Sequence, residues 1–149
     1  MSARRTNRNL RPLFVIGIIA IAIAWFAWPS SPERVLQAND AQYSLETVTT
    51  PEAMINGLGG RASLPKDTGM LFAYDQSAPN RCFWMKNMRF PIDIIWLGAG
   101  KKVVYIEHSV APNTYPKEFC AGEPSQFVIE LNAGEAHRAN IRTGQTLRF

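Results

Sequence analysis

The segment best equipped for chemistry is residues 83–97, FWMKNMRFPIDIIWL, in which polar and charged side chains interrupt an apolar run. Burying an unpaired polar group costs several kcal/mol, so a strand that only filled a core would have no use for them. We therefore expect this segment to turn between two strands or to line a cleft. The candidate ligand-binding residues are Trp84, Lys86, Asn87, Arg89 and Asp93.

Each of these residues also has a structural interpretation. Aromatic residues such as Trp84 could stack on sugar rings or bases, but aromatic residues in strands more often belong to the core. Asp93 could act in acid–base catalysis with Glu130 if the two carboxyl groups lay close together. It could instead pair with Lys86 or Arg89, or hydrogen-bond to a backbone turn, and the sequence favours such a structural role.

No recognised catalytic or metal-binding motif is present. The sequence lacks a nucleophile elbow, a phosphate-binding loop after a strand and a zinc-protease motif. His108 and His137 are the only histidines, and their neighbours do not match the spacing of known metal sites, so we expect both at the surface. The Gly-rich residues 57–60 follow a predicted helix and are more typical of a helix stop. The sequence predicts no metal and no cofactor, and it favours binding over catalysis.

Cys82 and Cys120 are the only cysteines. In an exported chain such a pair can form a disulfide, and closing this loop would stabilise the fold by about 4 kcal/mol in a chain-entropy estimate. A two-cysteine metal site or a redox pair is the alternative, but no Cys-x-x-Cys motif or neighbouring histidine supports it. The disulfide is the preferred interpretation.

The N-terminal region has the features of a membrane anchor. Residues 13–28, LFVIGIIAIAIAWFAW, contain no charge, and four arginines precede them. This arrangement predicts a cytoplasmic basic tail at residues 1–12, a transmembrane signal anchor at 13–28 and a linker at 29–40. The run lies between the lengths typical of a signal peptide and of a membrane span, so cleavage remains an alternative. The remaining residues, 41–149, would form a domain outside the cytoplasm or in the periplasm.

The positive net charge of +4 comes entirely from this tail. After Arg4, Arg5, Arg8 and Arg11, the remaining 12 lysines and arginines balance 12 acidic residues. Without a basic stripe or a nucleic-acid-binding motif, we expect no nucleic-acid partner. The predicted partners are the membrane, through the N-terminal helix, and an unknown envelope ligand or protein.

The rest of the chain alternates short strands with turns. Period-two patterns and turn residues predict seven strands, at residues 43–48, 70–74, 83–88, 92–97, 102–106, 127–131 and 146–149. Capping patterns at Thr49–Glu52 and Asn132–Glu135 predict two short helices that end near Asn56 and Asn140. Residues 107–125 are rich in turn formers and predict a long loop, which Cys120 would pin to Cys82.

Together these elements predict a β-rich α+β fold. We expect a compact, mostly antiparallel sandwich or partly closed barrel with two short helices, preceded by one N-terminal transmembrane helix.

Several motifs in this order resemble the DUF192 (UPF0127) family of uncharacterised bacterial and archaeal proteins. They cover roughly residues 43–149 and are Gly57-Leu58 with Arg61, Gly69-Met70-Leu71-Phe72, Phe83-Trp84-Met85-Lys86-Asn87-Met88, Pro91-Ile92-Asp93-Ile94 and Glu130-Leu131 before Ala133-Gly134. The resemblance supports the domain limits and agrees with export or anchoring, but it transfers no catalytic residue. Gly59 departs from the family, which commonly has methionine there, and the cysteine pair is not general to the family.

Three hypotheses for the function follow. The first is a membrane-anchored domain that binds a small envelope ligand or a protein partner in the polar-aromatic cleft. The second is an envelope hydrolase that uses Asp93 and Glu130, whose carboxyl groups would have to lie within about 5–10 Å of each other. The third is a structural assembly module, which would have no concave polar-aromatic site.

Overall fold

A computed structural model describes residues 33–149. The predicted anchor at 13–28 therefore lies outside the described residues. Among residues 33–149, no helix is long and apolar enough to cross a membrane.

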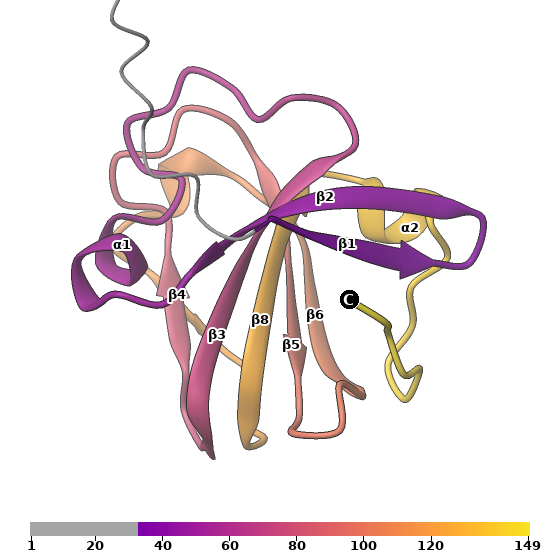
Figure 1. The fold of residues 1–149 in the computed structure, drawn as a ribbon. Coiled ribbons are helices and arrows are strands. Elements are labelled where there is room, and N and C mark those ends of the chain that lie inside the picture. Colours follow the sequence, from indigo (N-terminus) through magenta and orange to yellow (C-terminus); the bar gives the residue numbers. More distant parts are fainter. Residues whose placement is uncertain (1–32) are drawn as a thin grey trace, which may run out of the picture.

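The fold is built on a six-stranded mixed sheet with the order β1-β2-β3-β8-β5-β6 (Figure 1). Its strands are β1 (Glu33–Ala38), β2 (Ala41–Val48), β3 (Thr68–Ala78), β5 (Ile92–Leu97), β6 (Val103–Val110) and β8 (Ser125–Asn132). Only β2 and β3 pair in parallel, and the other neighbours are antiparallel. A separate two-stranded ribbon joins β4 (Cys82–Trp84) to β7 (Glu118–Cys120).

Two short α-helices and one 3-10 turn complete the described chain: α1 (Pro51–Asn56), η1 (Pro112–Thr114) and α2 (Glu135–Arg138). The predicted first helix is confirmed, although its N-cap is Thr50, whose hydroxyl accepts a hydrogen bond from the Ala53 N–H. Pro51 fits the first turn because its missing N–H would have no partner there. Gly57 ends the helix, as predicted.

Each face of the sheet carries its own core, because successive side chains of a strand point to opposite faces. One core packs β1, β2 and the C-terminal segment around Leu71, Ile95 and Leu131. The other packs the loop after α1 and the β4–β7 ribbon against Phe72, Ile94 and Trp96. All six residues of β5 are buried, as expected for a strand that is covered on both faces.

The structure corrects several sequence predictions about the sheet. Residues 33–38, assigned to the linker, form edge strand β1, which turns into β2 through Asn39 and Asp40. The β2–β3 pair is parallel because α1 and the following loop carry the chain back along the sheet, a crossover that the turn-rich sequence concealed. Residues 107–110, predicted as loop, extend β6, and part of the remainder forms β7.

Two predicted strands are shorter than expected. The strand predicted over 83–88 stops at Trp84, because a turn with Asn87 in the left-handed region follows. Residues 146–149 form only isolated bridges, with Arg148 opposite Gln37 of β1 and Thr146 opposite Lys102 just before β6. The C-terminal segment thus touches both edges of the sheet, but the sheet is not a closed barrel.

Helix α2 differs from the sequence prediction in how it begins. It is shorter than predicted and starts after Gly134, which is in the left-handed region. The predicted cap, Asn132, instead donates its amide to the carbonyl groups of Leu64 and Pro65. The Ala136 N–H in the first turn is bound by the distant Asp93 carboxylate at 2.9 Å. Asp93 therefore satisfies this N–H through a tertiary contact.

Candidate functional site

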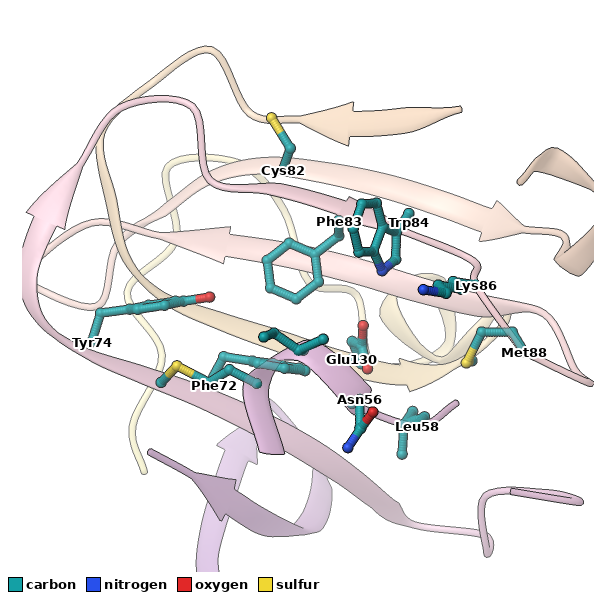
Figure 2. Close-up of a pocket in the computed structure, with 13 residues that line it drawn as sticks. Asn56, Leu58, Phe72, Tyr74, Cys82, Phe83, Trp84, Lys86, Met88 and Glu130 are labelled. Carbon is teal, nitrogen blue, oxygen red and sulfur yellow. The ribbon is translucent and has the colours of Figure 1, made fainter. Parts of the chain in front are cut away.

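A pocket of about 230 Å³ opens on the sheet face that carries the second core. The Glu130 pocket, as we name it, is lined from β3, β8, β4, the following turn, α1 and the turn after α1 (Figure 2). Its lining residues are Met54, Ile55, Asn56, Gly57, Leu58, Phe72, Tyr74, Cys82, Phe83, Trp84, Lys86, Met88 and Glu130.

Aromatic side chains form much of the wall. The rings of Phe72 and Phe83 pack edge to face with centroids 4.8 Å apart, and Phe83 packs in the same way on Trp96. Two of the lining residues remain exposed: Trp84 is 42% exposed and Ile55 of α1 is 65% exposed. The site thus joins a fixed aromatic interior to an exposed apolar rim.

Glu130 lies in the middle of this ring of side chains (Figure 2). Glu130 is only 5% exposed, and within residues 33–149 its Oε2 has no hydrogen-bond partner. Burial raises the pKa of the Glu130 carboxyl from its ordinary 4.5 to about 8, and the nearby Arg61 partly opposes the shift. The buried Glu130 carboxyl therefore keeps its proton to a higher pH than an exposed glutamate does.

Arg61 does not neutralise Glu130 directly. Its guanidinium forms a two-contact pair with the Glu46 carboxylate, at 3.0 and 2.8 Å. Tyr74 is a second polar neighbour, and burial raises its pKa, while the Arg81 guanidinium opposes the shift. Arg81 stacks on the Tyr74 ring at 3.5 Å, and its guanidinium donates hydrogen bonds to the carbonyl groups of Ser125 and Gln76. Arg61 and Arg81 are thus both already engaged by other groups of the protein.

Two glycines let the backbone approach this site closely. Gly57 has φ +49° and lines the Glu130 pocket. A Cβ added at this residue would lie 3.3 Å from the Phe72 ring and 3.9 Å from Glu130 Oε2. At Gly59 an added Cβ would lie 2.8 Å from the Asn56 carbonyl oxygen and 3.1 Å from that of Lys86. The turn after α1 therefore packs directly on the turn after β4, and the Gly60 N–H bonds to the Asn87 carbonyl.

A second pocket of about 490 Å³ adjoins the first. The basic pocket, as we name it, is lined by Ile55, Asn56, Gly59, Gly60, Lys86, Asn87, Met88 and Arg89. Four of these residues also line the Glu130 pocket: Ile55, Asn56, Lys86 and Met88. The Lys86 ammonium lies 5.9 Å from the centroid of the Trp84 ring. Within residues 33–149, neither Lys86 nor Arg89 forms an ion pair.

Four of the five predicted site residues, Trp84, Lys86, Asn87 and Arg89, line these two pockets. Asp93 does not, because it is fully buried on the other face of the sheet. Its Oδ1 accepts a hydrogen bond from the Ser109 N–H at 2.8 Å, and its Oδ2 accepts one from the Ala136 N–H. Of the structural roles considered for Asp93, the backbone contact is the one observed.

The Asp93–Glu130 pairing required by the hydrolase hypothesis is wrong. Glu130 lies opposite Ile94 in the β5–β8 register, whereas Asp93 lies opposite Leu131. Directly opposed residues share a face and neighbouring residues do not, so the two carboxyl groups point to opposite sides of the sheet. They cannot act together on one bond.

The predicted disulfide is formed. Cys82 and Cys120 face each other in the β4–β7 ribbon and are bonded. Within residues 33–149, they and Glu118 are the only cluster of potential metal ligands that lie close together, and the disulfide occupies both thiols. Because Cys82 also lines the Glu130 pocket, the bond ties the strand that carries Phe83 and Trp84 to β7.

Sequence reasoning missed the opposite half of the pocket. Phe72 and Tyr74 were expected only as strand residues, and Asn56 and Ile55 only as part of a helix. One signal was available, since Glu130 is a charged residue in an otherwise apolar alternating strand, FVIEL. An acid at an inward-facing strand position indicates either a partner or a function.

Comparison with known proteins agrees with this fold. Residues 34–149 match the family DUF192, described as an uncharacterized ACR. No curated protein matches the chain.

Similar solved structures include the following two. One, described as a candidate transcription regulator from Sinorhizobium meliloti, is 28% identical, with a TM-score of 0.71 over 78% of this chain and 92% of that one. The other, a protein of unknown function from Novosphingobium aromaticivorans, is 26% identical, with a TM-score of 0.70 over 78% of this chain and 84% of that one. With its fold, its motif order and the match over residues 34–149, the chain belongs to the DUF192 family.

Proposed function

We propose that this protein is a membrane-anchored binding domain whose ligand site is the Glu130 pocket. The observation that carries the proposal is the unpartnered Glu130 Oε2 at the centre of an open pocket with aromatic walls. Three buried hydroxyl groups among the described residues, those of Ser44, Thr47 and Ser125, also lack partners, but of these four residues Glu130 alone lines either pocket. Buried polar atoms usually have partners, so an unpartnered acid in a pocket points to a ligand that supplies one.

The geometry favours binding over hydrolysis. Among the described residues, no second carboxylate lines the Glu130 pocket, and Asp93 faces the other core. Lys86 and Arg89 add unpaired positive charge at the rim, and their side chains are exposed to incoming molecules. Concave, mostly apolar sites with a few convergent polar groups are typical of small-molecule binding.

The site also favours ligand binding over a purely structural assembly module. Such a module would need no buried, unpartnered acid, because burying one costs stability without adding to an interface. The balance of 12 basic and 12 acidic residues after Arg11 gives no support to a nucleic-acid partner. The description of the Sinorhizobium protein as a candidate regulator is therefore not extended to this chain.

A thermal-shift screen of the full-length chain in a mild detergent tests the binding function. Divalent metals, cell-wall glycan fragments and small metabolites would be compared on the wild type and on Glu130→Gln. A ligand at 100 times its dissociation constant should stabilise the folded protein by about 2.7 kcal/mol. The variant should lose this gain, whereas the same exchange at the exposed Glu123 should keep it. A flat screen with well-folded protein would instead favour the assembly module.

Membrane anchoring and location outside the cytoplasm are part of the proposal. The arginine-flanked apolar run at 13–28 supports them, as does the disulfide, since disulfides persist in oxidising compartments. The full-length chain should stay with membranes after alkaline extraction, and protease added outside the cell or to the periplasm should digest the domain. Recovery in the soluble cytoplasmic fraction would contradict this part of the proposal.

A further inference from the structure

We propose that the ligand is a small zwitterion, whose protonated amine pairs with Glu130 while its acidic group pairs with Lys86 and Arg89. This inference rests on the proposed function and names the chemical class that the site would take. It follows from the placement of one unpartnered acid and two unpaired cations in adjoining pockets.

The Glu130 pocket is suited to an amine. A primary ammonium offers three N–H donors, and Glu130 Oε2 lacks a donor. Hydrogen bonds between an ammonium and a carboxylate are roughly twice as strong as those between neutral groups. The surrounding rings of Phe72, Phe83 and Trp84 add favourable cation–π attraction, and the methionine and leucine side chains accommodate an alkyl body.

The charges around Glu130 leave room for an external cation. Arg61, from the loop after α1, is paired with Glu46 of β2. Tyr74 of β3 is a neutral phenol, and Lys86, from the turn after β4, lies at the boundary between the two pockets. When an amine binds, the Glu130 proton passes to the solvent, and the buried carboxylate then has a countercharge in contact.

The basic pocket is suited to the acidic end of the same molecule. Lys86 and Arg89 have no acidic partner within residues 33–149, and Asn87 adds an amide that can donate hydrogen bonds. Because Lys86 and Met88 line both pockets, a short ligand can extend from Glu130 to the cations without leaving the protein surface. A ligand with only an amine would leave Lys86 and Arg89 without an acidic partner, and a ligand with only an acidic group would leave Glu130 without a donor.

The methionines give a direct readout of binding. The chain has five, of which Met54 and Met88 line the Glu130 pocket, and Met70 and Met85 lie in the core. Full-length protein labelled with ¹³C at the methionine methyl groups would be titrated in detergent and followed by NMR. The probes are glycine, β-alanine, γ-aminobutyrate and ε-aminocaproate, with n-butylamine and butyrate as partners that each lack one charged group.

At least one amino acid of the series should shift the Met54 and Met88 signals, while those of Met70 and Met85 stay in place. Butylamine should bind about tenfold more weakly than the best amino acid, and butyrate more weakly still. Glu130→Gln should abolish the methionine shifts that the best amino acid and butylamine cause in the wild type. Lys86→Ala with Arg89→Ala should remove the advantage of the amino acid over butylamine.

The pH dependence separates this ligand class from its alternatives. Amine affinity should rise with pH until Glu130, with its pKa of about 8, is ionised, since the amine itself stays protonated over that range. Affinity that fell with increasing pH would mean that the neutral acid donates to a ligand acceptor, and the inference would be wrong.

Two further outcomes would overturn the inference, both readable in the wild type. If butyrate bound as well as γ-aminobutyrate, the pocket would be an anion site, and the proposed binding function would survive with another ligand class. If no probe moved Met54 or Met88, zwitterions would be excluded, and the proposed function would then be judged by the broader thermal-shift screen. Failure of both experiments would remove the binding function itself.

Discussion

Two buried carboxyl groups, those of Asp93 and Glu130, lie on opposite faces of one sheet and differ in their hydrogen bonds. Asp93 accepts hydrogen bonds at both oxygens, from the Ser109 and Ala136 N–H groups, and joins β6 to α2. Glu130, on the neighbouring strand, has an unpartnered oxygen and faces an open pocket. Buried acids with satisfied oxygens stabilise a fold, whereas one without a partner lowers stability and calls for an explanation in function.

This contrast also separates the two cores. The face with Asp93 is closed by β1, β2, α2 and the C-terminal segment. The face with Glu130 is covered by a short helix, a glycine-rich turn and a disulfide-linked ribbon, and it retains a cavity. We therefore expect substitutions on the Asp93 face to affect stability and those on the Glu130 face to affect binding.

The largest effect should come from Asp93→Ala. This change leaves two N–H groups without their acceptor, and we expect a loss of about 2–5 kcal/mol in the free energy of unfolding. Urea denaturation followed by circular dichroism measures it. The matched comparison is Glu130→Gln, which should be neutral or stabilising at neutral pH. If Glu130→Gln were the more damaging of the two, the contrast between the carboxyl groups would be wrong.

Removing the disulfide tests the Glu130 face in a different way. Replacing Cys82 and Cys120 together with serine should lower the free energy of unfolding by about 2–4 kcal/mol, since the bond closes a loop with a sequence separation of 38. Thermal unfolding with and without a reductant measures the loss. Because β4 carries Phe83 and Trp84, ligand affinity should fall as well, and unchanged affinity would show that the ribbon is not needed to shape the pocket.

The pH dependence of stability should reveal Glu130. Its folded-state pKa of about 8 lies above the ordinary 4.5, so the folded protein holds a proton that the unfolded chain releases. The contribution of Glu130 to the free energy of unfolding is fully present below pH 4.5. It is lost as the pH rises toward 8, at up to about 1.4 kcal/mol per pH unit. In Glu130→Gln this dependence should disappear. Parallel stability curves for wild type and variant would show that the carboxyl is ionised when buried.

The smallest expected loss of stability is that of Gly57→Ala. The residue has φ +49°, and the new methyl group would lie 3.3 Å from Phe72, so we expect a cost of about 1–2 kcal/mol. Ligand affinity should fall by more than this cost implies, because the methyl group lies over Glu130 Oε2. Gly100→Ala, in the β5–β6 turn, has open space and serves as the control. Equal effects at the two positions would contradict a special role for Gly57.

The sequence predicted the parts of the fold that depend on local patterns. Alternating residues marked β2, β5 and β8, and the capping pattern predicted at Thr49 with the stop at Gly57 placed α1 to within one residue at its start. The unusual polar content of residues 83–97 predicted a cleft; Trp84, Lys86, Asn87 and Arg89 line the two pockets, whereas Asp93 does not. The DUF192 resemblance, carried by short ordered motifs, is confirmed.

What required the tertiary structure was the sheet register and the packing across it. Asp93 and Glu130 are both acids in apolar strands, and nothing in their local sequence shows that one meets two N–H groups while the other meets none. The two N–H groups that Asp93 meets belong to Ser109 and Ala136, which lie 16 and 43 residues away from it in the sequence. The sequence alone shows that Asp93 and Glu130 are acids that are costly to bury in apolar strands. Only the tertiary structure shows that backbone hydrogen bonds offset this cost for Asp93, whereas within residues 33–149 Glu130 Oε2 has no such bond.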